Sequence, residues 1–408
     1  MRILTFTGLF PHSEDPSHGI FVYQRSVHLA ARSGNDVEVV APVPYLPRWL
    51  KTQRWRKASV PSQENVGGLR VYHPRYFLLP KVWMPFHALS MFLGSLRRVT
   101  KLNREARFDC IDAHFVYPDG LAAVLCGKVL GIPVTVSARG SDINSYPEYR
   151  LIRPMIKWTL EHAANVIAVS AALKDAMLAL GASPSKIHVI PNGVDAERFR
   201  CMARGEARKK LKLSSNAEIL ISVGALILAK GHHLLIQAFA QIAPRHPDLQ
   251  LYILGEGSYR PELEKLVRRM GLRDNVQMPG KRPNEELQLW FNAANLSCLA
   301  SAREGWPNVI IESLACGTPV VATRVGGIPE ILRKPELGVL VEQTVDSIAT
   351  GLEKALSKNW DREEISKLTL GRTWEVVAAE VEAVLAQHVQ IKSDFSREGE
   401  SRTTPAAF

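Results

Sequence analysis

Two acids separated by seven residues, Glu304 and Glu312, lie in the largely apolar segment at 304–332. Pro307 or Asn308 can begin a helix, because both residue types are favoured at helix starts, and Glu312 then falls about one turn in. There it can simply compensate the helix dipole. An ionised carboxylate is also a pure hydrogen-bond acceptor, and the hydroxyls of sugars and ribose are donors. The pair therefore suits a polyhydroxyl ligand, with dipole compensation as the alternative for Glu312.

Two earlier loops carry glycines directly after predicted strands. In the loop ISVGALILAKG, Gly224 ends a strand and Lys230 precedes a helix. A lysine there can meet a phosphate at the helix N-terminus, and the alternative is a solvated surface lysine. In LYILGEG, a strand ends with Gly255 and Gly257, but Arg260 stands where a dinucleotide fingerprint has its last glycine. A nicotinamide site is therefore not indicated.

The elements that must position these loops alternate between short apolar runs and helical patterns. This alternation predicts an α/β fold of two tandem, doubly wound, Rossmann-like domains. We expect an N-terminal domain over 1–195, a C-terminal domain over 215–372, a helix over 373–389 that packs back on the first domain, and a disordered tail over 390–408. Ligands of open α/β sheets bind beyond the carboxyl ends of the strands, which is where the marked loops lie.

Composition bounds the classes of partner and compartment. The 408 residues are 46% hydrophobic and 22% charged, which suits two globular domains. A net charge of +11 favours a phosphate-bearing ligand or an anionic membrane, whereas the dispersed basic residues carry no nucleic-acid reader motif. Five scattered cysteines without a Cys-x-x-Cys pair indicate reduced thiols in a reducing cytosol. The apolar run that ends before Pro11 is shorter than a signal peptide needs, and no apolar run reaches about 20 residues. We therefore expect a cytoplasmic protein, soluble or peripheral at the inner face of the cell membrane.

Residues 81–107 interrupt the alternation with an amphipathic segment. Apolar and aromatic residues at 83–96 are followed by five basic residues at 97–107. Such a helix can lie on an anionic bilayer, where each nearby basic residue adds about 1 kcal/mol. The alternative is a surface helix packed on the core, whose basic end is merely solvated.

With the surrounding motifs, Glu304 and Glu312 resemble the Glu-(seven residues)-Glu signature of the family-four retaining glycosyltransferases, which have the GT-B fold. The similarity runs to about residue 389 and includes GIFVYQRSVHLA, FDCIDAHFVYPDG, SARGSDIN, VIPNGVDAERF, AKGHHLLIQAFA and PGKRPNEEL in family order. The first three of these stretches are most similar to bacterial members that build exopolysaccharide, capsule or teichuronic-acid-type polymers. The resemblance implies two Rossmann-like domains facing a central cleft.

The resemblance also implies residue roles. Lys230 is expected to neutralise the donor diphosphate, Glu304 to bind donor-sugar hydroxyls near the anomeric carbon, and Glu312 to hold the nucleotide ribose. His114 is expected to face the donor sugar and the β-phosphate. Gly19 is expected to lie under the diphosphate and the acceptor, and Arg282 near the base. The other expected donor-binding positions are Gly224, Gly255, Gly305 and Asn308.

The reaction implied is transfer of a sugar from a UDP- or GDP-sugar to a glycan or lipid-linked glycan. We expect retention of configuration by a front-face route, in which the β-phosphate serves as the base. The sequence lacks an Asp-x-Asp motif, so we expect neither a metal nor another cofactor. The leaving diphosphate would be stabilised electrostatically by Lys230 and helix N-termini.

Two departures from the family pattern stand out. Ala225 replaces a common arginine that contacts the diphosphate, and the candidates to replace it are Arg139, where many relatives have histidine, and Arg324. Pro307 lacks an N–H, so one backbone donor is missing, and Asn308 can compensate through its side chain. Two other functions stay open: a nucleotide-sugar epimerase on the same fold, against which the Glu pair and the PNGVD linker argue, and a non-catalytic sugar-nucleotide-binding protein, which the missing arginine at Ala225 keeps open.

Overall fold

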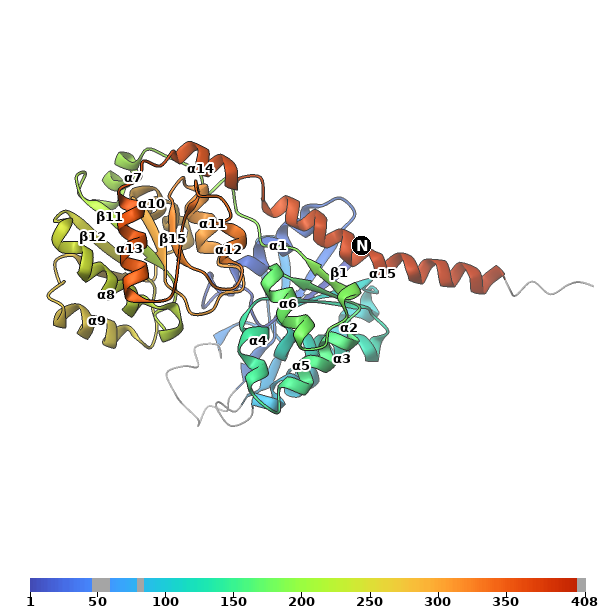
Figure 1. Ribbon diagram of the computed structural model, residues 1–408. Coiled ribbons are helices and arrows are strands. Elements are labelled where there is room, and N and C mark those ends of the chain that lie inside the picture. The colour runs from blue at the N-terminus through green and yellow to red at the C-terminus, as the bar shows by residue number, and fades with distance from the viewer. Residues whose placement is uncertain (46–58, 79–83, 402–408) are drawn as a thin grey trace, which may run out of the picture. The chain divides into compact units, whose positions relative to one another are not determined.

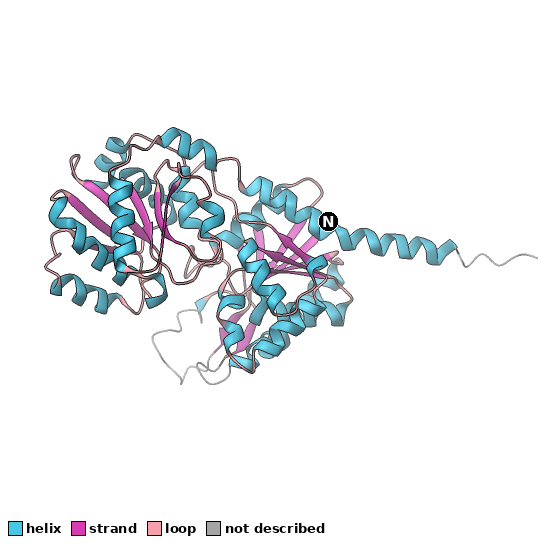
Figure 2. Ribbon diagram, in the orientation of Figure 1, coloured by secondary structure: helices cyan, strands magenta, loops and turns pink. Residues whose placement is uncertain are grey.

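The computed structural model describes residues 1–45, 59–78 and 84–401, with side chains described as far as Gln387 (Figure 1). The chain divides into two compact units. The first comprises Met1–Pro191 and the C-terminal segment from Trp374, and the second comprises Asn192–Thr373. The second unit therefore includes residues 196–214, which lie between the two expected domains, and residues 192–195, which were expected in the first domain. Each unit is an α/β sandwich in which helices flank a sheet (Figure 2).

The first unit is built on a sheet that has eight strands within the described residues, in the order β10-β9-β8-β7-β1-β2-β5-β4. Neighbours pair in parallel except for β4 against β5. Strands β1, β7, β8 and β9 are almost wholly buried, as expected for parallel strands covered on both faces. The bounds are β1 (Arg2–Phe6), β2 (Asp36–Val40), β4 (Gln63–Val66), β5 (Leu69–Tyr72), β7 (Cys110–His114), β8 (Val134–Ala138), β9 (Asn165–Ala168) and β10 (Ile187–Val189), with β3 (Val43–Tyr45) and β6 (Arg75–Phe77) paired separately.

The helices of the first unit follow the alternation read from the sequence. They are α1 (Ile20–Ala31), α2 (His87–Glu105), α3 (Leu121–Leu130), α4 (Ser141–Asn144), α5 (Arg153–His162), α6 (Ala171–Ala179) and α15 (Trp374–Ser401), with the short turns η2 (Met84–Phe86), η3 (Val116–Gly120), η4 (Tyr146–Glu148) and η5 (Pro184–Lys186). None of the helices in the described part of the chain is long and apolar enough to cross a membrane.

Helix α15 packs on α1 within this unit. Val22 and Leu29 of α1 share a buried cluster with Trp374, Val377 and Val381 of α15. The helix continues to Ser401, so the expectation of disorder from residue 390 is wrong for 390–401. The stretch is polar but contains good helix formers and no proline, which lets a helix that is already nucleated by packing extend. Residues 402–408 of the expected tail lie outside the described residues.

The second unit has a sheet of six parallel strands among the described residues, in the order β13-β12-β11-β14-β15-β16. Their bounds are β11 (Glu218–Val223), β12 (Leu249–Leu254), β13 (Val276–Gly280), β14 (Leu296–Leu299), β15 (Val320–Thr323) and β16 (Gly338–Val341). Its helices are α7 (Arg204–Leu211), α8 (His232–Ile242), α9 (Arg260–Arg269), α10 (Asn284–Ala293), α11 (Asn308–Ala315), α12 (Ile328–Ile331), α13 (Val345–Leu356) and α14 (Arg362–Thr369), with the turns η6 (Leu228–Lys230) and η7 (Ala243–Arg245).

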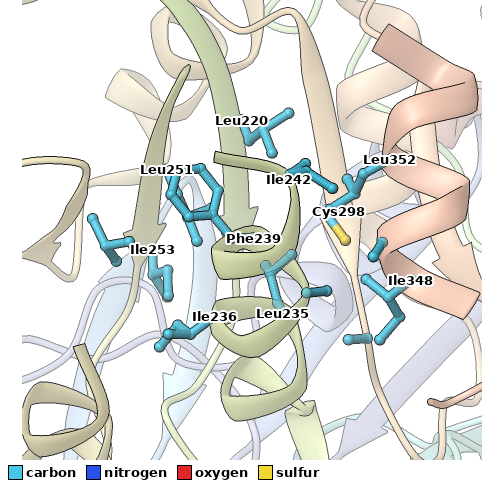
Figure 3. Close-up of a cluster of buried hydrophobic side chains, with 14 of the residues drawn as sticks. Leu220, Leu235, Ile236, Phe239, Ile242, Leu251, Ile253, Cys298, Ile348 and Leu352 are labelled. Carbon is cyan, nitrogen blue, oxygen red and sulfur yellow. The ribbon is translucent and has the colours of Figure 1, made fainter. Parts of the chain in front are cut away.

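The core of this unit locks α8 onto the sheet. Leu235 and Phe239 of α8 belong to a fully buried cluster with Leu220 of β11 and Leu251 of β12 (Figure 3). Apolar residues at i and i+4 put both helix side chains on one face, and the strands offer a continuous apolar surface to it. The loop between β11 and α8, which carries Gly224 and Lys230, is therefore held at both ends by rigid elements.

Candidate active site

Each sheet has a switch point, where the strand order changes direction. In the second unit the chain runs outward from β11 through β12 and β13 and then returns to β14 on the other side of β11. In the first unit β1 lies between β2 and β7. Loops that follow the two strands at such a point diverge and leave room for a ligand at the carboxyl edge of the sheet. In the second unit Lys230 follows β11 and Glu304 follows β14, and in the first unit His114 is the last residue of β7. The predicted residues Gly255, Arg282 and Arg139 follow the neighbouring strands β12, β13 and β8.

Lys230 and Glu304 meet at the switch point of the second unit. Lys230 ends η6 after β11, Glu304 follows β14, and Lys230 Nζ lies 2.6 Å from Glu304 Oε1. Ser301 Oγ donates to the same oxygen at 2.7 Å. The two charged side chains are 26% and 9% exposed, respectively. Among the described contacts both donors engage Oε1, so Oε2 is the oxygen that can accept a ligand hydroxyl.

The glycine loops of this unit approach each other backbone to backbone. A Cβ added at Gly255 would lie 1.9 Å from the carbonyl oxygen of Gly224, closer than any side chain can come. Gly255 therefore lets the loops after β11 and β12 touch. Gly305 is buried, and its carbonyl accepts the backbone N–H of Gly327 at 3.2 Å. These glycines have no side chain that could bind a ligand. Their role is to let the backbones of the loops approach each other.

Helix α11 begins at Asn308 with Pro307 as its N-cap, as predicted. Asn308 Oδ1 accepts a hydrogen bond from Asn192 Nδ2 at 3.0 Å, which orients the Asn308 amide. Glu312 is half-buried, and burial raises the pKa of its carboxyl to about 7, against the opposing charge of Arg198. An acid that titrates near neutrality can switch between a donor and a pure acceptor of hydrogen bonds.

Two arginines lie at the periphery of the second unit's loops. Arg282 precedes α10, and its Nε lies 3.9 Å from Glu286 Oε1. Arg324 Nε lies 3.6 Å from Glu342 Oε1, and both of those side chains are mostly exposed. Arg324 is thus engaged with an acid at the surface, and Ala225 is itself exposed in the loop after β11.

The first unit brings His114 and Arg139 together with two residues that sequence reasoning missed. Asp112 and His114 are two residues apart on β7 and point to the same face of the sheet. His114 Nε2 lies 3.4 Å from Asp112 Oδ2, and Arg25 Nη2 of α1 lies 2.7 Å from Asp112 Oδ1. The Arg139 guanidinium contacts His114 Nδ1 through Nη2. Arg25, Asp112 and His114 are almost completely buried.

The electrostatics of this cluster favour a neutral imidazole beside an ionised carboxylate. Burial lowers the pKa of His114 far below its usual range, and Arg139 lowers it further, against the pull of Asp112. Burial alone would raise the pKa of Asp112, but Arg25 and His114 outweigh it and lower that pKa. Burial and the charge of Arg25 lower the pKa of Arg139 to about 9, which leaves it protonated at neutral pH.

Arg139 and Gly19 lie near each other through the start of α1. Gly19 caps α1 in the left-handed region, with φ of 65°, and a Cβ there would lie 2.3 Å from the Leu9 carbonyl oxygen. Phe21, in the first turn, presents its ring 5.2 Å from the Arg139 guanidinium carbon. Arg139 is thus held between an aromatic ring and an imidazole.

Family models match both halves of the chain. The model described as Glycosyltransferase Family 4 matches residues 19–198, and the model described as Glycosyl transferases group 1 matches residues 203–369. TuaC of Bacillus subtilis (strain 168), a glycosyltransferase named for teichuronic acid biosynthesis, is 28% identical over 392 residues, which cover 94% of this chain and 95% of that protein. The D-inositol 3-phosphate glycosyltransferase of Corynebacterium urealyticum is 30% identical over 294 residues, which cover 67% of this chain and 69% of that protein.

Solved structures with this fold include a sucrose-phosphate synthase from Thermosynechococcus elongatus, with a TM-score of 0.73 at 21% identity, covering 97% of this chain and 99% of that one. Anabaena HepE in complex with UDP and glucose aligns with a TM-score of 0.72 at 18% identity over 95% of this chain and 100% of that one. The two units and their neighbours define an enzyme class, the glycosyltransferases of the GT-B fold. Within that class, the chain belongs to glycosyltransferase family four.

Proposed function

We propose that this glycosyltransferase moves a sugar from a UDP- or GDP-sugar, with retention of configuration, to a glycan or lipid-linked glycan in surface polysaccharide synthesis. The observation that carries the proposal is the contact of Lys230 and Ser301 with one oxygen of Glu304. It sets a cation and an orientated carboxylate at the switch point of a parallel sheet, where ligands of such sheets bind. The likeness to TuaC supports the choice of polysaccharide acceptor.

In this proposal, the second unit holds the donor. Lys230 neutralises the charge that develops on the β-phosphate, which is electrostatic stabilisation of the leaving group. Glu304 Oε2 accepts a hydroxyl of the donor sugar, while Ser301 and Lys230 keep Oε1 in place. Glu312 accepts the ribose hydroxyls in its ionised form. Asn308 donates through Nδ2, because its Oδ1 is taken by Asn192.

The first unit supplies a phosphate contact and the acceptor side. Arg139 is the phosphate contact, since a guanidinium binds phosphate through paired N–H donors. It thereby compensates for the arginine that Ala225 replaces. His114 acts through its position, because its ring nitrogens face Asp112 and Arg139. The β-phosphate, rather than an enzyme side chain, takes the acceptor proton in a front-face reaction without metal. Glu304 is held by two donors, which suits hydroxyl binding better than nucleophilic attack.

A donor screen tests the proposal. Thermal shift is measured against a panel of UDP-, GDP- and ADP-sugars, and one base is expected to raise the melting temperature. Lys230→Ala is expected to lose the response, while Lys354→Ala, on α13 of the same unit, retains it. The product's anomeric configuration is read by NMR, and excess EDTA is expected to leave the rate unchanged. Epimerised free sugar nucleotide without transfer would support the epimerase alternative, and binding without any turnover would support the non-catalytic one.

The exposed face of α2 favours a second role, attachment to an anionic membrane. Phe86, Leu89 and Leu93 are 54%, 48% and 63% exposed, and Arg97 and Lys101 continue the same helix face. The opposite face of α2 is buried in the unit, so packing does not require the exposed side chains to be apolar. Residues 81–83 of the predicted segment lie outside the described residues.

Flotation with vesicles tests this attachment. The protein is expected to float with phosphatidylglycerol vesicles at low salt and less at high salt, because surface charges are screened. Leu89→Ser with Leu93→Ser is expected to abolish flotation. Leu151→Ser, which changes a leucine that is 67% exposed elsewhere in the same unit, serves as the control. Equal flotation with neutral phosphatidylcholine vesicles would contradict an electrostatic attachment.

A further inference from the structure

Four charged or titratable side chains of the first unit form a chain of contacts. The chemistry of each group determines whether it donates or accepts a hydrogen bond. An arginine can only donate hydrogen bonds and an ionised carboxylate can only accept them. Arg139 therefore donates to His114 Nδ1, which must be an acceptor without a proton. The proton of the neutral ring is then on Nε2, which faces Asp112 Oδ2 at 3.4 Å. Arg25 donates to the other oxygen, Asp112 Oδ1, at 2.7 Å.

The fold surrounds this chain with groups that fix it. Ser137 is the Cα partner of His114 in the pairing of β7 with β8, and its Oγ accepts the second arm of Arg25 at 2.7 Å. Asp142 accepts the backbone N–H of Arg139 at 3.1 Å and that of Gly140 at 2.8 Å, which fixes the backbone from which Arg139 projects. The cluster thus joins α1, β7, β8 and the loop after β8.

Burying these charges is costly, and a fold that needed only stability would not require them. Buried ion pairs are often no more stabilising than apolar residues of the same volume. Arg25 is 2% exposed, Asp112 and His114 are fully buried, and Arg139 is the member of the cluster that reaches partial exposure. The cluster runs from the protein interior to the carboxyl edge of the sheet, where the candidate ligand residues lie.

We infer that Arg25 and Asp112 are positioning residues of the transfer reaction: they hold His114 in its Nε2-protonated tautomer, and His114 Nδ1 in turn directs the Arg139 guanidinium. The inference rests on the proposed function for Arg139 as a phosphate contact. The phosphate can come from the donor diphosphate or from a phosphorylated lipid-linked acceptor. The two sources share one chemistry, and the effect on the two Michaelis constants separates them.

The tautomer is tested directly in the wild-type protein. Side-chain ¹⁵N–¹H NMR of histidine-labelled protein is expected to show His114 as a neutral ring with its proton on Nε2 between pH 6 and 8. His114→Gln assigns the signal by its loss. An Nδ1-protonated ring or an imidazolium would overturn the inference. This measurement needs no substrate, so its failure is distinct from failure of the proposed function.

The reaction part is tested by a double-mutant cycle. Asp112→Asn keeps the volume but replaces the carboxylate, which accepts from Arg25 and faces His114 Nε2, by a neutral amide. With the donor that the screen selects, kcat/KM is expected to fall by about 10- to 100-fold, as for a misplaced contact. In an Arg139→Ala background the same change is expected to cost less than about threefold, because its effect passes through Arg139. Equal losses in both backgrounds would overturn the inference.

The control variant separates positioning from stability. Glu38→Gln also alters a buried acid paired with arginines in the same sheet, since Glu38 is 1% exposed and contacts Arg2 and Arg70. Its melting temperature is expected to fall, while kcat/KM stays within about twofold of wild type. If Glu38→Gln loses as much activity as Asp112→Asn at an equal melting temperature, the role of Asp112 is structural only. In Asp112→Asn, a rise confined to the donor KM assigns the phosphate to the donor, and a rise confined to the acceptor KM assigns it to the acceptor.

Discussion

The charged side chains at the two switch points differ in burial and in how many of their polar atoms face protein groups. In the first unit Arg25, Asp112 and His114 are almost completely buried, and protein groups face both nitrogens of His114 and both oxygens of Asp112. In the second unit Lys230 is 26% exposed, and its contact with Glu304 engages one carboxylate oxygen. The first cluster is enclosed by protein groups, whereas the second keeps polar groups at the surface of the site. The difference indicates that the first unit's cluster is preorganised and that the second unit binds its ligand through side chains.

This contrast also has an energetic side. Breaking a buried ion pair by removing one partner costs about 3–5 kcal/mol, because the other charge is left unpaired. Ion pairs with solvent access contribute about 0–1 kcal/mol. Variants of the second unit's pair should therefore report on function with little loss of stability. Variants of the first unit's cluster must be compared with a matched control.

Glu304→Gln is expected to have the largest effect on activity. The change keeps the shape but replaces one carboxylate oxygen by an NH₂ group that cannot accept a hydroxyl. We expect kcat to fall by about 100-fold or more with little change in melting temperature, as for the loss of a group that stabilises the transition state. Steady-state rates with the selected donor measure it. Glu353→Gln, which alters an exposed pair with Arg245 in the same unit, should leave kcat unchanged; a wild-type rate for Glu304→Gln would contradict the assignment.

Gly255→Ala is expected to have the next largest effect. The new methyl group would lie 1.9 Å from the Gly224 carbonyl oxygen, so the two loops must separate. We expect a loss of about 1–3 kcal/mol in the free energy of unfolding and about tenfold weaker binding of the nucleoside diphosphate. Gly271→Ala is the matched control, because Gly271 also has a positive φ, of 70°, but has open space around its Cβ position. It should lose stability without loss of binding, and equal binding losses would contradict the role of the loop contact.

Glu312 allows the second switch point to be tested by pH. Burial raises the pKa of Glu312 to about 7, so the fraction that is ionised grows as pH rises through that value. Donor affinity should therefore increase by about tenfold from pH 6 to 8, when measured by calorimetry, if the ribose needs the carboxylate. Glu312→Gln should remove this dependence. Affinity that is independent of pH in the wild type would show that ribose binding does not require the ionised form.

The stability of the ligand-free protein should change in the opposite sense. A raised folded-state pKa means that the folded protein binds the proton more tightly, so the contribution of Glu312 to stability is present below about pH 4.5 and is lost as pH rises through about 7. Glu312→Gln should therefore be more stable than wild type at pH 8, by about 1–3 kcal/mol, and close to it at pH 4.5. Urea unfolding at the two pH values measures the difference.

The same contrast determines what could be predicted from the sequence. Lys230, Glu304 and the start of α11 were recognisable because glycines, prolines and charged residues mark loops after strands. Arg25 and Asp112 were not, because each lies inside a regular element and looks like an ordinary polar residue. Their contact joins positions 87 residues apart, and only the strand order brings them together. Ser301 was missed because a serine at a strand end carries no signal until its neighbour's direction is known. The extension of α15 was missed because polar composition was given more weight than helix propensity.

Ala225→Arg is expected to have the smallest effect and the opposite sign. Ala225 is exposed in the loop after β11, next to Gly224, so the longer side chain can be accommodated without displacing the core. A second cation near the diphosphate would add a charge-assisted hydrogen bond, worth about 1.5–3 kcal/mol before the cost of ordering the side chain, and we expect donor KM to fall by about two- to fivefold. If Arg139 already supplies this charge, the gain should be larger in an Arg139→Ala background than in the wild type. An identical gain in both backgrounds would show that the two arginines act on different groups, and that Arg139 belongs with the acceptor.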